Sequence, residues 1–165
     1  MTIYPSLIDV NFGVPVAVMI VIAIAVFTDL KSRRIPNWLT VSALAGALVF
    51  HLATGGLPGL ISSFCGFLTG FGVLLALFLI GGGGGGNVKL MGAVGAWIGA
   101  WPTILVFVGS AAFVLMLMIG LVIVKGPNHK SEDGKSLVKL TLPYAVPLAL
   151  SLVTVLIIDS FTPFV

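Results

Sequence analysis

Few side chains in this sequence can do acid–base chemistry, and Asp29 is the strongest candidate among them. Five of the 165 residues are acidic, and Asp29 follows an apolar stretch and directly precedes the basic segment LKSRRIPN. An ionisable side chain at membrane depth is costly, and is therefore a candidate for a functional site. A simpler interpretation, an acid at a helix end paired with Arg33 or Lys31, stays open.

The second candidate is a run of glycines, Gly81–Gly86, that leads into Asn87-Val88-Lys89. Without Cβ atoms these residues can turn sharply and let another backbone approach, and we do not expect them to form a stable helix end. The run lacks the Gly-Lys-Ser/Thr ending and the preceding strand of a phosphate-binding loop. Two interpretations stay open: a flexible linker, or a mobile element that places polar Asn87 at the mouth of a helix.

The candidate metal ligands are scattered. His51 lies in an apolar stretch without a second ligand at helical spacing, so we expect it to hydrogen-bond a neighbouring helix. Cys65 is the single cysteine, which rules out an intrachain disulfide, and we expect it to be a small packed residue. We therefore predict no bound metal and no cofactor.

The composition indicates the elements that must position these residues. Hydrophobic residues make up 59% of the chain, charged residues 8%, and the mean hydropathy is +1.23. Soluble domains carry roughly a quarter charged residues, and disordered chains are less hydrophobic still, so both classes are excluded. The net charge of +3 comes from too few basic residues for nucleic-acid binding. The expected surroundings are a lipid bilayer.

The apolar stretches predict an all-α membrane protein with six spans of about 20 residues or somewhat fewer. The first is expected near residues 14–28, and the next two near 38–53 and 57–80, broken at 54–56. Two more fit within 90–124, with a turn near 100–102, and the last near 140–158. The glycines at 66, 70, 92, 95 and 99 suit close helix packing.

This arrangement puts every basic residue on the same side of the membrane, which the positive-inside rule assigns to the cytoplasm. Both chain ends then lie outside, and the segments that carry Asp29 and Asn87 lie on the cytoplasmic side. The basic residues are Lys31, Arg33, Arg34, Lys89, Lys125, Lys130, Lys135 and Lys139. The segment from Lys125 to Lys139 is predicted to be a mobile polar loop.

Asp29 followed by Arg33-Arg34-Ile35-Pro36-Asn37, together with a glycine-rich segment running into Asn87-Val88-Lys89-Leu90, resembles the type IV prepilin peptidases, which are GxGD-type intramembrane aspartic proteases. The resemblance covers nearly the whole chain, including a Pro143-Tyr144 pair near the last helix. It implies that Asp29 is one catalytic residue and that Asn87 stands at the position of the second. The motif-supporting residues it implies are Arg33, Ile35, Pro36, Asn37, Gly84, Gly86 and Lys89.

Asn87 departs from the GxGD motif, which has Asp there. In the mechanism that the resemblance implies, two carboxylates share one proton, one acting as base on a water and the other donating a hydrogen bond. Asn87 can donate but cannot exchange that proton, so we expect an intact substrate site with turnover absent or severely reduced. Because Asn is nearly isosteric with Asp, we interpret it as an engineered inactivating change in preference to a natural one.

The resemblance also implies a substrate and a place in the cell. The chain looks like the short, CpaA/TadV-like form found with tight-adherence (Tad/Flp) pilus systems, a single domain over residues 1–165 without a methyltransferase or zinc domain. The expected substrate is a prepilin with a basic leader and an apolar helix, cleaved at the cytoplasmic face of the prokaryotic inner membrane. Two alternatives are a small proton- or ion-coupled transporter and a non-catalytic pilin-binding membrane protein.

Overall fold

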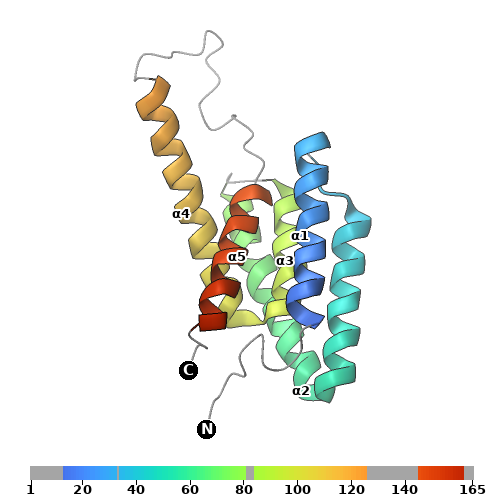
Figure 1. Cartoon of the computed structure of the whole chain (residues 1–165). Coiled ribbons are helices and arrows are strands. Elements are labelled where there is room, and N and C mark those ends of the chain that lie inside the picture. The colour runs from blue at the N-terminus through green and yellow to red at the C-terminus, as the bar shows by residue number, and fades with distance from the viewer. Residues whose placement is uncertain (1–12, 33, 81–83, 126–144, 162–165) are drawn as a thin grey trace.

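The computed structural model describes residues 13–32, 34–80, 84–125 and 145–161, which form a bundle of α-helices without a strand in these ranges (Figure 1). The prediction of an all-α fold is thus confirmed for this part of the chain. The helices are α1 (Gly13–Ser32), α2 (Asn37–Leu79), α3 (Gly85–Ile98), α4 (Ala100–Lys125) and α5 (Ala145–Phe161).

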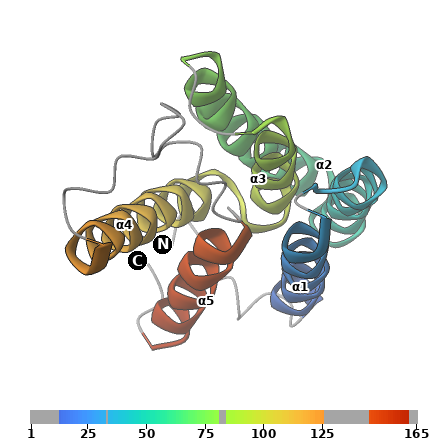
Figure 2. The same ribbon diagram turned by 90° about the horizontal axis from the view of Figure 1, so that it is seen from above.

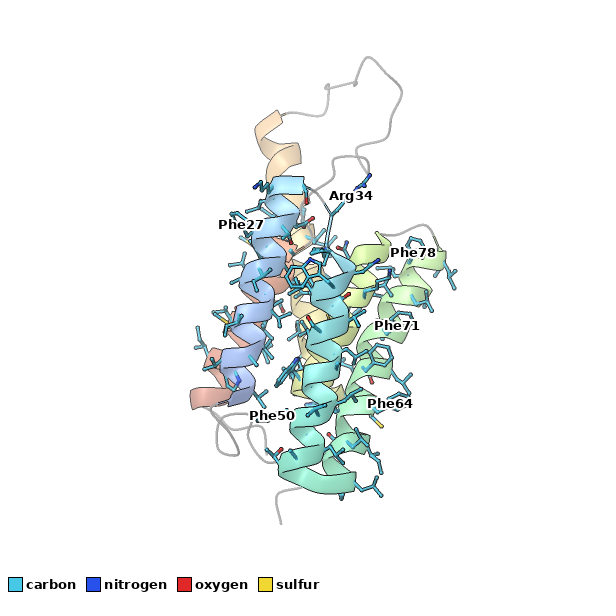
Figure 3. The ribbon with its side chains drawn as sticks, turned by 90° about the vertical axis from the view of Figure 1, so that its right-hand side faces the viewer. Phe27, Arg34, Phe50, Phe64, Phe71 and Phe78 are labelled. Atoms are coloured by element: carbon cyan, nitrogen blue, oxygen red, sulfur yellow. The ribbon has the colours of Figure 1, made fainter. Side chains whose placement is uncertain are left out.

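Helix α2 is bent back on itself in its middle. Gly56 has φ 59° and ψ −147°, a conformation that glycine adopts without strain, and Pro58 follows within the helix. The two limbs lie side by side, so that Arg34 before the first limb and Phe78 in the second point to the same end of the molecule (Figure 3). The predicted break at residues 54–56 is confirmed, although the two limbs count as one helix.

A second glycine separates α3 from α4. Gly99 has φ 83° and accommodates the sharp change of direction between the two helices. The turn lies just before the predicted 100–102, because Trp101 and Pro102 already belong to the first turn of α4. Proline is tolerated there since the N–H groups of a first turn have no intrahelical acceptor.

Three helical stretches are long and apolar enough to cross a membrane: α1, α2, and Ala100–Leu117 of α4. Helix α5 contains a shorter apolar stretch, Ala145–Ile158, and the part of the predicted span before Ala145 lies outside the described residues. The 14 residues of α3 span about 21 Å at 1.5 Å per residue, less than the roughly 30 Å of a bilayer core. By length and composition the described part of the chain therefore supplies three candidate spans, fewer than the six predicted.

Helix α3 lies at the centre of the bundle, packed against α2 and contacting α1 and α4 (Figure 2). Each residue from Leu90 to Ile98 is buried. The backbones come unusually close, since a Cβ on Gly66 of α2 would lie 2.9 Å from the carbonyl carbon of Gly95 and 2.9 Å from Gly99 Cα. The predicted role of these glycines in close packing is confirmed.

The predictions for His51 and Cys65 have opposite outcomes. The Nε2–H of His51 donates a hydrogen bond of 3.1 Å to the Trp97 carbonyl of α3, which confirms the predicted interhelical bond. Cys65 is exposed on α2, so the expectation of a packed cysteine is wrong. The predictions for Arg33, Gly81–Gly83, the 125–139 loop beyond Lys125 and Pro143-Tyr144 lie outside the described residues.

Candidate active site at one end of the bundle

Asp29 is one of the few buried polar residues, with 7% of its surface exposed, in the last turns of α1. Its Oδ2 accepts a hydrogen bond of 3.2 Å from the backbone N–H of Ala145, the first residue of α5. Lys31 does not pair with it; the ammonium of Lys31 lies 5.8 Å from the ring centroid of Phe27. Among the described residues Asp29 makes no ion pair, which disfavours the interpretation that Asp29 is a helix-end acid paired with Lys31.

A short turn connects α1 to α2. The Ser32 hydroxyl donates to the Thr28 carbonyl at 2.8 Å, near the end of α1. Pro36 then has extended angles, φ −69° and ψ 137°, and caps α2, accepting a bond of 3.2 Å from the Leu39 N–H. Because proline fixes φ and disfavours a helical residue before it, Ile35-Pro36 ends one helix and starts the next at Asn37.

The glycine-rich segment enters α3 directly. Gly84 is extended, with φ −112° and ψ 145°, and Gly85 and Gly86 form the first turn of the helix. The Asn87 N–H donates to the Gly84 carbonyl at 3.0 Å. The expectation that these glycines would not form a helix end is therefore wrong for Gly85 and Gly86. The buried apolar residues that follow supply the packing that stabilises a weak first turn.

Two contacts join the start of α3 to the turn before α2. Lys89 Nζ donates a hydrogen bond of 3.0 Å to Asn37 Oδ1, and both side chains are exposed. A Cβ on Gly86 would lie 3.5 Å from the Cβ of Ile35, an ordinary packing distance. The segments around Ile35–Asn37 and Gly84–Lys89, far apart in sequence, thus form one unit at this end of the bundle.

Asn87 sits in this unit on α3, and α1, which carries Asp29, contacts α3. The Asn87 side chain is half-buried and makes no hydrogen bond to another described residue. The structure therefore places the motif-supporting Ile35, Pro36, Asn37, Gly84, Gly86 and Lys89 at the same end of the molecule as Asp29 and Asn87; Arg33 lies outside the described residues.

The site offers one carboxylate for proton transfer and one amide that can donate a hydrogen bond. Within the described ranges, no group of three or more His, Cys, Asp or Glu side chains could hold a metal ion. Sequence reasoning missed the contribution of Ala145. The donor is a backbone N–H, which every residue except proline has, so the sequence offered no signal for it.

The described part of the chain is thus a bundle of apolar helices, three of them long enough to cross a membrane, with a buried aspartate at one end. Residues 16–125, more than half of the chain, match the type IV leader peptidase family, and the chain belongs to this family. The prepilin leader peptidase/N-methyltransferase of Aeromonas hydrophila is 34% identical over 113 residues, which are 64% of this chain and 38% of that protein.

The protein of the same description from Aeromonas salmonicida strain A449 is 31% identical over 112 residues, with the same coverage of each chain. The chain thus spans 38% of the length of each of these curated relatives. No solved structure matches the chain.

Proposed function

We propose that the chain is an aspartic-type prepilin peptidase in which Asp29 and residue 87 form the catalytic pair. The observation that carries the proposal is the burial of Asp29 at the end of the bundle where the Asn37 and Lys89 segments are joined by a hydrogen bond. Membership of the leader peptidase family supports a prepilin as the substrate. The peptide bond to be cleaved then lies where a prepilin's basic leader meets its apolar helix.

The proposed chemistry needs two carboxylates. One takes a proton from a water that attacks the scissile carbonyl, and the other, in its neutral form, donates a hydrogen bond to the developing negative charge. An asparagine at position 87 keeps the hydrogen-bond donor and loses the exchangeable proton. We therefore propose that this chain binds prepilin and cleaves it very slowly or not at all, and that its substrate is of the Flp type.

The proposed topology has six membrane crossings, counting the two limbs of α2 separately and including α3 and α5. Both ends of the chain lie outside, and Asp29 and Asn87 face the cytoplasm. The distribution of basic residues along the sequence supports this orientation, because six crossings would put all of them on one side, which the positive-inside rule assigns to the cytoplasm. The expected location is a prokaryotic inner membrane.

The test is cleavage of a cognate prepilin by the Asn87→Asp variant in detergent or liposomes. We expect cleavage to appear in Asn87→Asp and to disappear again when Asp29→Asn is added. Binding of prepilin by both the chain and its Asn87→Asp variant without cleavage by either would select a non-catalytic pilin-binding protein. Proton flux into liposomes that depends on Asp29 would select the transporter.

A further inference from the structure

The carboxylate of Asp29 has a partner that the two sequence motifs do not supply. Its Oδ2 accepts the Ala145 N–H at 3.2 Å, and the two residues are 116 positions apart in the chain. Among the described residues this is the one hydrogen bond made by the Asp29 side chain. It connects the candidate catalytic residue to α5, outside the two motifs around Asp29 and Asn87 and next in sequence to the Pro143-Tyr144 pair.

The position of Ala145 makes this bond favourable. The first N–H groups of a helix have no intrahelical acceptor, and the dipole of the helix places partial positive charge at this end. A carboxylate that is buried needs hydrogen bonds to offset the loss of water. The Ala145 N–H of α5 therefore stabilises the buried carboxylate of Asp29.

The bond is also held rigidly. Ala145 and Leu148 are fully buried, and Pro147 between them is almost fully buried, so the first turn of α5 is part of the core. Helix α5 packs against α1 and, more extensively, against α4. The first turn of α5 therefore has little freedom to move relative to Asp29.

We propose that the backbone N–H of Ala145 is a positioning group for the peptidase reaction, an inference that rests on the proposed function. It holds Oδ2 of Asp29 and leaves Oδ1 to accept a proton. In the reaction, the water oxygen bonds to the scissile carbonyl carbon and its proton goes to Oδ1. The carbon–nitrogen bond then breaks, and the leaving amine takes up that proton.

The variant that removes the donor is Ala145→Pro, because proline has no N–H and is tolerated at the first helical position. In the Asn87→Asp background we expect kcat to fall roughly 10- to 100-fold, the loss typical of a hydrogen bond to a charged group, with KM little changed. Ala145→Gly keeps the N–H and should lower kcat far less. Val146→Pro removes the next N–H along the helix and serves as the matched proline control, with turnover retained.

A second measurement uses the chain as it stands and needs no turnover. The Ala145 amide, followed by NMR in micelles, should be shifted downfield and protected from hydrogen exchange, and Asp29→Ala should abolish both effects. The inference would be overturned if Asp29→Ala left the chemical shift and exchange protection of the Ala145 amide unchanged. Equal kcat values for Ala145→Pro and Val146→Pro would overturn it as well. Absence of cleavage by Asn87→Asp itself would instead refute the proposed function, and the catalytic role of Ala145 with it.

Discussion

Among the described glycines, Gly66 has the least room for an added Cβ, and it gives the sharpest test of the fold. A Cβ on Gly66 would lie 2.9 Å from Gly99 Cα and 2.9 Å from the Gly95 carbonyl carbon, and nearer still to the Gly95 oxygen. All three are backbone atoms of the segment that ends α3, so no side-chain rotation can make room. We therefore expect Gly66→Ala to push α2 and α3 apart, although it adds one methyl group.

The size of the effect follows from two opposing terms. Forcing an extra methyl group into a packed core costs about 1–3 kcal/mol, and a shift of α3 also disturbs its neighbours. Replacing a helical glycine with alanine otherwise gains up to about 1 kcal/mol of helix propensity. Gly72 on the same limb of α2 has no atom within 4 Å of its added Cβ, so Gly72→Ala measures the second term alone. Because both variants share the propensity gain, they should differ by the steric term alone, roughly 1–3 kcal/mol.

The assay is unfolding in detergent, by heat or by SDS titration, on both variants and the unchanged protein. We expect Gly72→Ala to match or exceed the stability of the unchanged protein and Gly66→Ala to fall well below it. Equal stability of the two alanine variants would show that α2 and α3 do not approach as closely as the structure indicates. The steric argument would then be refuted.

Three further perturbations address single contacts. Trp97→Phe removes a buried hydrogen bond of 2.9 Å from the indole N–H to a backbone carbonyl of α2. We expect it to lower the free energy of unfolding by about 1 kcal/mol. Trp101→Phe, at an exposed position, is the control and should leave the free energy of unfolding unchanged. Lys89→Met removes the hydrogen bond to Asn37. Because both side chains are exposed, the midpoint of unfolding should hardly change. Cleavage by the Asn87→Asp protein should fall when Lys89→Met is added. Gly85→Ala has open space around its Cβ within the first turn of α3 and should raise stability by up to about 1 kcal/mol, read from the same unfolding curves. A loss of stability in the last case would mean that this glycine needs a conformation other than the helical one.

The sequence predicts the helices of this fold well because their signals are local. Apolar runs mark the helices, and Gly56 and Gly99 take the positive φ that ends them close to the predicted positions. The proximity of Ile35–Asn37 to Lys89 could be anticipated through a family resemblance alone, since nothing in the local sequence relates the two segments. Their physical link is a single side-chain hydrogen bond between residues 52 positions apart.

In contacts between a side chain and the backbone of a distant helix, the partner escaped prediction, even for His51, whose bond to a neighbouring helix was expected. Asp29 bonds the Ala145 N–H, Ser63 donates to the Ala96 carbonyl at 2.7 Å, and Trp97 donates to α2. Every residue has a backbone carbonyl, and every residue except proline has a backbone N–H, so the residue type does not show which of these groups a polar side chain will bond. Such bonds are determined by how the helices are packed, and a pattern of residue types therefore carries no signal for them.

The length of α3 connects the fold to the proposed chemistry. At about 21 Å, the helix is shorter than a bilayer core of roughly 30 Å, so the crossing proposed at α3 needs residues beyond the helix itself. Its C-terminal end is fixed by bonds from His51 and Ser63 to its last carbonyls, at the end of the bundle away from Asp29. If that end lies near the outer face, the first turn of α3 falls short of the inner face. Asn87 would then lie within the membrane boundary. The proposed prepilin substrate would have to bring its scissile bond to the same depth in the membrane.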